Sequence, residues 1–326
     1  MRAVVIREPG GPEVLELREV AEPSPSSGEV RVRVRATAVN RADLLQRMGL
    51  YPAPPGDPQD VPGLELAGEI DAVGPGVTEW RVGDRVYGLV GGGAYAEKVV
   101  VHARAIAAMP ARLSFEEAAA IPEATLTAYD AMVEQAGLGA GDNVLVNAAG
   151  SGVGTAAVQI ARALGAFVVG TARSQDKLDR AAALGLDRGV LPADGRFADA
   201  VRAATGGRGV DVVLELVGGN YLEEDILACA ERGRVVVVGL VGGATAGVAL
   251  ALLLKKRLRI FGTVLRSRPL EEKIAAAQLL GRRIGPLVER GAVKPVVDAV
   301  LPLDRAGEAH RLVASNATFG KIVLSV

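Results

Sequence analysis

The sequence has very little cysteine or histidine. Cys229 is its one cysteine, and His102 and His310 are its two histidines. A lone cysteine cannot close an internal disulfide, and so few soft ligands do not suggest a structural zinc site. We therefore expect a protein of a reducing compartment, the cytoplasm, and we assign no metal ligand. Both histidines are expected to be structural or to face solvent.

Charge of one sign and aromatic side chains are also scarce. The 37 basic and 38 acidic residues leave a net charge of -1, and aromatic residues make up 3% of the chain. Attraction to a phosphate backbone needs a basic excess, and base stacking needs aromatic rings. Nucleic acid is therefore not expected as a partner.

Long hydrophobic runs are absent as well. The longest, Val248–Leu254, leads directly into Lys255 and is far shorter than the roughly 20 residues that span a bilayer. The N-terminal segment MRAVVIREPGG is too short for the core of a secretory signal and favours an edge strand. We expect no membrane segment and no signal peptide.

The chain shows two different sequence patterns, one in each half. Its 326 residues, 49% of them hydrophobic, exceed what one core usually organises. Up to about residue 120, proline and glycine interrupt short β-rich runs such as Val30–Ala36, which predicts an irregular β-barrel-like domain. From about residue 142, apolar runs of strand length alternate with helical segments. This pattern is typical of an α/β domain with a doubly wound parallel (Rossmann) sheet.

The elements of this second part follow from the pattern. Strands are expected at Asn143–Val146, Phe167–Thr171, Asp211–Glu215, Arg234–Val238 and Arg259–Gly262, and helices at Gly154–Leu164 and Leu270–Ile284. After about Pro286 the chain turns β-rich, then shows a helix at Ala306–Ala314 and a last strand, and this tail could rejoin the first domain. We predict domains at 1–122 and 123–286, with a return to the first domain at 287–326.

A glycine-rich turn follows the first predicted strand of the second domain. From Gly141 the sequence reads GDNVLVNAAGSGVGTAAVQIARALG, a strand, a turn of small residues and a helix. Small side chains let the backbone approach a pyrophosphate, which free amides and the helix dipole stabilise. The strict G-x-G-x-x-G pattern is not met, and such a turn can also be close packing alone. In its strand-turn-helix context, it predicts a dinucleotide site with contacts from Ala149, Ser151, Gly152, Val153 and Gly154.

The end of the second strand bears on the choice of cofactor. NAD enzymes place an acid there for the ribose hydroxyls, whereas this chain reads Thr-Ala-Arg-Ser from Thr171. Arg173, the Ser174 hydroxyl and Lys177 would instead bind a 2′-phosphate, with Ser174 also serving as a helix N-cap. The alternative is a solvated helix start. We predict NADPH.

The chain resembles the zeta-crystallin-like quinone oxidoreductases, a zinc-free family of the medium-chain dehydrogenase/reductase superfamily. The residues that carry the resemblance are Gly141, Asp142, Leu145, Ala149, Gly150, Gly152, Gly154, Gln159 and Arg162. Ser151 departs from the family pattern, where glycine is commoner. The strings GGPE (10–13), NRADL (40–44), GGGA (91–94), AAAIPEA (118–124), LRSR (265–268) and GKIVL (320–324) resemble the tumour-suppressor-induced subgroup. The resemblance implies a GroES-like catalytic domain, a Rossmann NADPH domain, an active site in the cleft between them and a homodimer.

The same resemblance bears on zinc. Zinc alcohol dehydrogenases of the superfamily hold the metal with a cysteine and a Gly-His-Glu segment, which here become Asn40 and Gly63-Leu64-Glu65. Neither Asn40 nor Leu64 is a zinc ligand, so no Lewis acid would polarise an alcohol. We therefore expect a zinc-free reduction of acceptors that are already electrophilic, above all quinones.

The resemblance also implies pocket residues. Asn40 and Tyr51 match positions that face the nicotinamide and the substrate, where an amide or a phenol could hydrogen-bond the reduced oxygen or the carboxamide. For Tyr51, packing against loop prolines is an even alternative. Thr127 could line the nicotinamide or serve as a structural helix start.

Later strand ends add candidate cofactor contacts, because open parallel sheets bind ligands at the carboxyl ends of their strands. The candidates are Val217, Gly239, Leu240, Val241, Leu265, Arg266 and Ser267, together with Lys321, which could reach the cofactor phosphate from the tail. Glycine-rich strand ends are also simple turns, which is the alternative for this group.

We predict NADPH-dependent reduction of quinones. Two alternatives stay open: reduction of enones or enoyl thioesters by the same fold, and a nucleic-acid-binding or crystallin-like structural protein. For the homodimer, the segment at 258–264 could supply an edge strand that pairs across a two-fold axis.

Overall fold

The computed structural model describes residues 1–326 and divides into two compact units. Unit 1 comprises Met1–Leu126, Leu265–Gly291 and Pro295–Val326, and unit 2 comprises Thr127–Val264 and Ala292–Lys294. The predicted nucleotide domain differs, because it included residues 265–286. The parallel sheet ends at Gly262, and Ile274 then packs into the core of unit 1 with Val86 and Ile106. No helix combines the length and apolarity that a membrane span requires.

Unit 2 is built on a six-stranded sheet in which every pairing is parallel. Its strands are β8 (Asn143–Val146), β9 (Phe167–Thr171), β10 (Arg188–Val190), β11 (Val210–Glu215), β12 (Cys229–Val237) and β13 (Arg259–Gly262). The order across the sheet is β10-β9-β8-β11-β12-β13. Counted from β8 this is 3-2-1-4-5-6, the doubly wound order that binds dinucleotides where the strand order reverses, between β8 and β11. The predicted fold class is confirmed.

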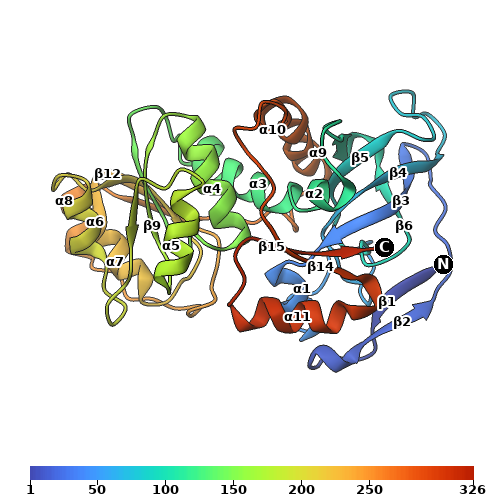
Figure 1. Cartoon of the computed structure of the whole chain (residues 1–326), viewed down its shortest axis with the longest axis horizontal. Coiled ribbons are helices and arrows are strands. Elements are labelled where there is room, and N and C mark those ends of the chain that lie inside the picture. Colours follow the sequence, from blue (N-terminus) through green and yellow to red (C-terminus); the bar gives the residue numbers. More distant parts are fainter. The chain divides into compact units, whose positions relative to one another are not determined.

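Helices cover this sheet, which explains why its central strand β8 is largely apolar. Val144, Leu145 and Val146 of β8 are fully buried, as expected of a parallel strand covered on both faces. The helices are α4 (Gly152–Ala163), α5 (Gln175–Ala182), α6 (Ala198–Ala204), α7 (Tyr221–Ala228) and α8 (Leu250–Lys256). In Figure 1, α4 and α5 lie near β9, while α6, α7 and α8 gather at the other end of this unit.

Unit 1 is organised around one long strand, β3 (Glu29–Ala38), which pairs with β4, β6 and β15. The seven-stranded sheet contains β3, β4 (Glu65–Val73), β5 (Arg85–Leu89), β6 (Lys98–His102), β7 (Ile106–Ala108), β14 (Val297–Pro302) and β15 (Lys321–Ser325). Val30, Val32 and Val34 are buried on one face of β3 and alternate with arginines, the period of a strand with one wet face. β15 pairs with β3, so the tail returns to this sheet.

Short helices and a small ribbon complete the structure. β1 (Arg2–Ile6) pairs with β2 (Leu15–Glu19) in a separate two-stranded ribbon. The helices of unit 1 are α1 (Arg41–Arg47), α2 (Phe115–Ala119), α9 (Leu270–Leu279), α10 (Gly285–Glu289) and α11 (Ala306–Ser315), and α3 (Pro122–Tyr129) contains the division between the units. The predicted helix at Leu270–Ile284 is α9 followed by a π-helical turn at Leu280–Ile284. In Figure 1, α11 lies near β14 and α1 within this unit.

Candidate active site

The turn between β8 and α4 is as tight as the glycine-rich sequence predicts. The Ser151 hydroxyl caps α4 by accepting a hydrogen bond of 3.0 Å from the Gly154 amide. A Cβ on Gly154 would lie 2.3 Å from the carbonyl oxygen of Ala148, so no larger residue fits there. The Ala149 amide donates to the Thr171 carbonyl at 2.8 Å, which ties the turn to the end of β9.

This turn has the features that hold a pyrophosphate. Gly152 and Val153 begin α4, and amides in the first turn of a helix have no acceptor within the helix. The positive end of the helix dipole lies at the same place. Close backbone approach at Gly154 and these amides fit a dinucleotide, although packing alone would also require the glycine.

The end of β9 carries the residues predicted to select NADPH. Arg173 and Ser174 are exposed, and Lys177 lies half-buried in the first turn of α5. Ser174 occupies the N-cap position, but its hydroxyl makes no cap hydrogen bond, so the predicted capping role is wrong. No acidic side chain stands between Thr171 and Ser174.

Two loops follow β11 and β12, where further cofactor contacts were predicted. Val217 is half-buried, whereas Leu240 and Val241 are 54% and 55% exposed. A Cβ on Gly239 would lie 2.2 Å from the Leu216 carbonyl oxygen, so this glycine is required by packing whether or not a ligand binds. The Gly242 amide donates to the Val217 carbonyl at 2.6 Å, which joins the two loops.

In unit 1, Asn40 lies in a buried polar network with Glu65 and Lys321. The Lys321 ammonium contacts Glu65 Oε1 at 2.8 Å, Asn40 Oδ1 at 2.5 Å and the Val39 carbonyl at 3.1 Å. Asn40 Nδ2 donates to Glu65 Oε1 at 2.8 Å and to the Ala38 carbonyl at 3.2 Å. Glu65 is fully buried, and Lys321 is 6% exposed.

These contacts change two predicted roles. The three N–H groups of the Lys321 ammonium are already matched by three oxygens, so its predicted contact with a cofactor phosphate is wrong. Both N–H groups of the Asn40 amide are likewise used. Asn40 can therefore accept one more hydrogen bond at Oδ1 but has no donor left for a substrate oxygen.

Tyr51 is held by Arg266 rather than by prolines alone. The guanidinium lies 5.2 Å from the centre of the Tyr51 ring and donates to the Tyr51 carbonyl at 3.2 Å. It also donates to the Gly91 carbonyl at 2.7 Å and to Gln46 Oε1. Arg266 is thus committed within unit 1, which contradicts its predicted role as a cofactor contact. Burial raises the pKa of the Tyr51 phenol, which therefore stays protonated at neutral pH.

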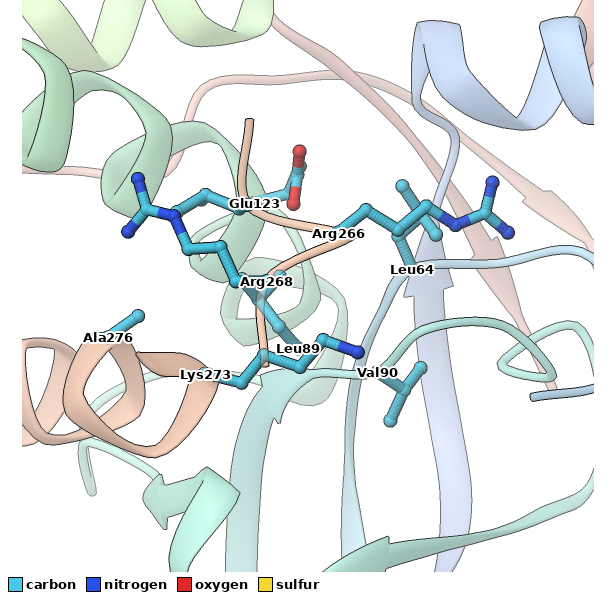
Figure 2. Close-up of a pocket in the computed structure, with 9 residues that line it drawn as sticks. Leu64, Leu89, Val90, Glu123, Arg266, Arg268, Lys273 and Ala276 are labelled. Carbon is cyan, nitrogen blue, oxygen red and sulfur yellow. The ribbon is translucent and has the colours of Figure 1, made fainter. Parts of the chain in front are cut away.

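A pocket of unit 1 lies beside this network. Its apolar lining comprises Leu64, Leu89, Val90, Leu265 and Ala276, and its polar lining comprises Glu123, Arg266, Arg268 and Lys273. Figure 2 shows the Arg266 guanidinium directed away from that of Arg268. Leu265 thus contributes to the pocket wall, whereas Ser267 is exposed. Leu64, which corresponds to a metal-ligand position of the zinc alcohol dehydrogenases, presents an apolar side chain to the pocket. No group of three or more His, Cys, Asp and Glu residues is arranged to hold a metal ion.

Thr127 is 7% exposed and is the sixth residue of α3, so the helix-start alternative is wrong. His102 Nδ1 accepts a hydrogen bond from the Arg104 amide at 3.2 Å. His310 is fully buried in a polar chain that sequence reasoning missed.

That chain begins at Arg47 and ends at Asp43, which lies on α1 near Asn40. Arg47 contacts His310 Nδ1 at 3.3 Å, His310 Nε2 contacts the Tyr95 hydroxyl at 3.2 Å, and the hydroxyl donates to Asp43 Oδ2 at 3.2 Å. Because arginine can only donate, we assign the imidazole proton to Nε2. Asp43 Oδ2 also accepts a hydrogen bond from the backbone amide of Asn40 at 2.8 Å, so these polar contacts support the turn that carries Asn40.

Comparison with known proteins identifies the fold more closely. A family model described as "Alcohol dehydrogenase GroES-like domain" matches residues 26–111, and one described as "Zinc-binding dehydrogenase" matches residues 152–281. The fold is therefore that of a two-domain dehydrogenase.

Relatives over the full length narrow the class. The human quinone oxidoreductase is 35% identical over 330 residues, covering 99% of this chain and 97% of that protein. The structure of Escherichia coli quinone oxidoreductase complexed with NADPH is 31% identical, covers 100% of both chains and has a TM-score of 0.89. The structure of an NAD-dependent alcohol dehydrogenase is 40% identical with the same coverage and a TM-score of 0.88. The chain belongs to the quinone oxidoreductase family of the medium-chain dehydrogenase/reductase superfamily.

Proposed function

We propose that this protein reduces quinones with NADPH, without zinc. The observation that carries the proposal is the set of cationic and hydroxyl side chains at the end of β9, combined with the absence of an acid there. Arg173 and Lys177 suit a 2′-phosphate, and the amides of α4 suit the pyrophosphate. NADPH, when bound, supplies the hydride.

The acceptor would lie in the pocket of unit 1. Its apolar wall fits a flat ring system, and Leu64 there offers no ligand to a metal. The Asn40 amide is already bonded to Glu65 and Lys321. These residues favour an acceptor that needs no Lewis acid, in contrast to the alcohol substrate of the NAD-dependent relative.

The residues of the chain would position the reactants and supply a proton. The Tyr51 phenol is protonated at neutral pH and can donate to a reduced oxygen, as can water. Asn40 Oδ1 can accept a hydrogen bond from the nicotinamide carboxamide. The Arg266 guanidinium packs against the face of the Tyr51 ring and so positions Tyr51.

A substrate panel tests the proposal. We expect NADPH to be oxidised with 1,4-benzoquinone and naphthoquinones at a kcat/KM at least about tenfold above that with enones or enoyl thioesters, a difference of about 1.4 kcal/mol in transition-state binding. Faster turnover of enoyl thioesters or enones would reassign the substrate class. Turnover with none of the three, with salt-dependent retention on single-stranded RNA instead, would favour the binding-protein alternative.

We also propose a homodimer in a cytoplasmic setting. β13 is an edge strand of the sheet of unit 2, and Val264, two residues after its end, is 53% exposed. An unpaired edge with apolar neighbours can pair with a second copy across a two-fold axis. Cys229, the one cysteine, is unpaired and buried, which fits a reducing compartment.

A further inference from the structure

Two fully buried carboxyl groups face one another beside the loops of the proposed cofactor site. Glu215 ends β11 and Asp225 lies on α7, and both have no exposed surface. Asn147, directly after β8, donates through Nδ2 to Glu215 Oε2 at 2.5 Å and to Asp225 Oδ1 at 2.8 Å. The charged groups that act most strongly on Asp225 are two carboxylates, Glu215 and Glu224.

The hydrogen bonds around Glu215 assign the charge to it. Glu215 Oε1 accepts from the amides of Val217 and Gly218, the latter at 2.5 Å. Backbone amides can only donate, so they favour an ionised carboxylate. Asn147 is held in one orientation, because its Oδ1 accepts the Thr171 hydroxyl at 2.8 Å and its Nδ2 therefore faces the two carboxyls.

Asp225 has the opposite surroundings. Its Oδ2 is buried, and if Asp225 and Glu215 were both ionised this oxygen would have no hydrogen-bond partner. Burial and the neighbouring Glu215 raise the pKa of Asp225 well above its usual value. A proton on Asp225 removes the repulsion between two carboxylates and gives Oδ2 a hydrogen-bond partner. Its O–H can then donate to Glu215, which lies within hydrogen-bonding reach.

The pair is connected to three of the loops that would surround the cofactor. The Glu215 carboxylate fixes the turn at Val217 and Gly218, and its backbone carbonyl accepts from the amides of Val238 at 2.9 Å and Gly239 at 3.2 Å. Through Asn147 and the Thr171 hydroxyl, which accepts from the Ala148 amide at 3.4 Å, the network reaches the glycine-rich turn. Asn147 and Glu215, at the ends of β8 and β11, lie where the strand order reverses.

We propose that Glu215 and Asp225 share a single proton, and that ionised Glu215 is a positioning residue that sets the Val217–Gly218 turn for NADPH. The positioning role of Glu215 rests on the proposed function. The shared proton concerns the protein without cofactor and is tested separately.

Infrared spectroscopy tests the shared proton. A protonated buried carboxyl group gives a carbonyl stretch that is distinct from that of a carboxylate and shifts in D2O. We expect this band in the wild-type protein at about pH 8, where Asp43 with its pKa of about 6 is ionised, and its loss in Asp225→Asn, whose amide can make the same hydrogen bonds as the neutral acid. The absence of the band in the wild type, or its persistence in Asp225→Asn, would overturn the shared proton.

Cofactor titration tests the positioning role. In Glu215→Gln the side-chain amide would face the Nδ2 of Asn147, donor against donor, so the turn should shift. We expect the Kd and KM for NADPH to rise about tenfold with the KM for quinone unchanged, while Asp225→Asn stays within about twofold of wild type. Glu215→Asp, which keeps the charge but withdraws it by one methylene, should show the same defect and serves if Glu215→Gln does not fold.

The outcomes separate the two proposals. If the wild-type protein fails to bind NADPH, the proposed function fails, and the infrared band still decides the shared proton. If the wild type binds NADPH and both folded Glu215 variants bind it equally well, the positioning role is overturned. Equal rises in the KM for NADPH and for quinone would also overturn it, because they would indicate a general structural defect.

Discussion

At the scale of single residues, buried polar side chains in this protein are matched so that donors meet acceptors. The Lys321 ammonium has three oxygen partners, and the Asn40 amide donates to two. Removing one partner of such a buried set leaves the other unsatisfied, which costs more than the hydrogen bond itself contributes. Two residues, the exposed Arg173 and the buried His310, can each be tested by a single substitution.

The first concerns Arg173 and cofactor choice. If Arg173 holds the 2′-phosphate, Arg173→Ala should weaken NADPH by about 1.5 to 3 kcal/mol, or one to two decades in Kd, and leave NADH nearly unchanged. Ala172→Asp should narrow or invert the preference, because it repels the phosphate and offers a carboxylate to the ribose hydroxyls. Fluorescence titration of both cofactors measures this. Equal losses for both cofactors in Arg173→Ala would mean that Arg173 belongs to a solvated helix start.

The second concerns His310 and acid stability. Burial and the nearby Arg47 lower the pKa of His310 to about 3. As the pH falls below the free value of about 6.5, the unfolded chain takes up a proton that the folded chain does not, so folding stability is lost at up to about 1.4 kcal/mol per pH unit. Asp43 acts in the opposite sense, because burial raises its pKa to about 6 and the folded state keeps a proton that the unfolded state releases.

Comparison with His310→Gln isolates the histidine, since Asp43 is present in both proteins. Glutamine can accept from Arg47 and donate to Tyr95 as the neutral imidazole does, but it does not titrate. We expect the free energy of unfolding of the wild type to fall more steeply than that of the variant between about pH 6.5 and 4.5 in urea titrations. Parallel curves would show that His310 does not remain neutral in the folded state.

At the scale of elements, the edge strand β13 determines the expected assembly. We expect light scattering to give twice the chain mass of 33.6 kDa at micromolar concentration. Ile260→Pro should shift the mass towards the monomer, because proline removes an amide from the edge. Ile260→Val is the matched control and should remain dimeric. A wild-type monomer would contradict the proposed dimer.

The elements also show what sequence reasoning could and could not predict. β8, β9 and β13 have the predicted bounds, and for β8 and β9 the reason is that buried parallel strands are continuous apolar runs. β12 begins at Cys229, before the predicted Arg234, since an irregular register with β11 extends the pairing. α9 was assigned to the wrong unit because helical periodicity does not say which core a helix packs against.

The candidate site was predictable where a motif is local. The glycine-rich turn and the acid-free end of β9 are contiguous in sequence, and the structure arranges both at the carboxyl edge of the sheet. The roles of Arg266 and Lys321 could not be predicted from the sequence, because their partners lie up to 282 residues away along the chain. Glu65 and Glu215 had one available signal, an acid within or at the end of an apolar strand segment.

At the scale of the whole molecule, we propose a two-domain reductase whose chemistry needs no metal. Unit 2 offers a sheet with the strand order of dinucleotide-binding folds, and unit 1 offers a pocket with an apolar wall and, separately, a buried network of Lys321, Asn40 and Glu65. Leu64 lines the pocket and Asn40 bonds Lys321 and Glu65, and we propose that reduction depends on NADPH and on an electrophilic acceptor.

The most direct test is the initial rate of NADPH oxidation by a quinone before and after exhaustive dialysis of the protein against a chelator. We expect the same rate in both samples and no increase when zinc is added back, because neither Asn40 nor Leu64 is a zinc ligand. Loss of the rate on dialysis, with recovery on addition of zinc, would contradict this expectation.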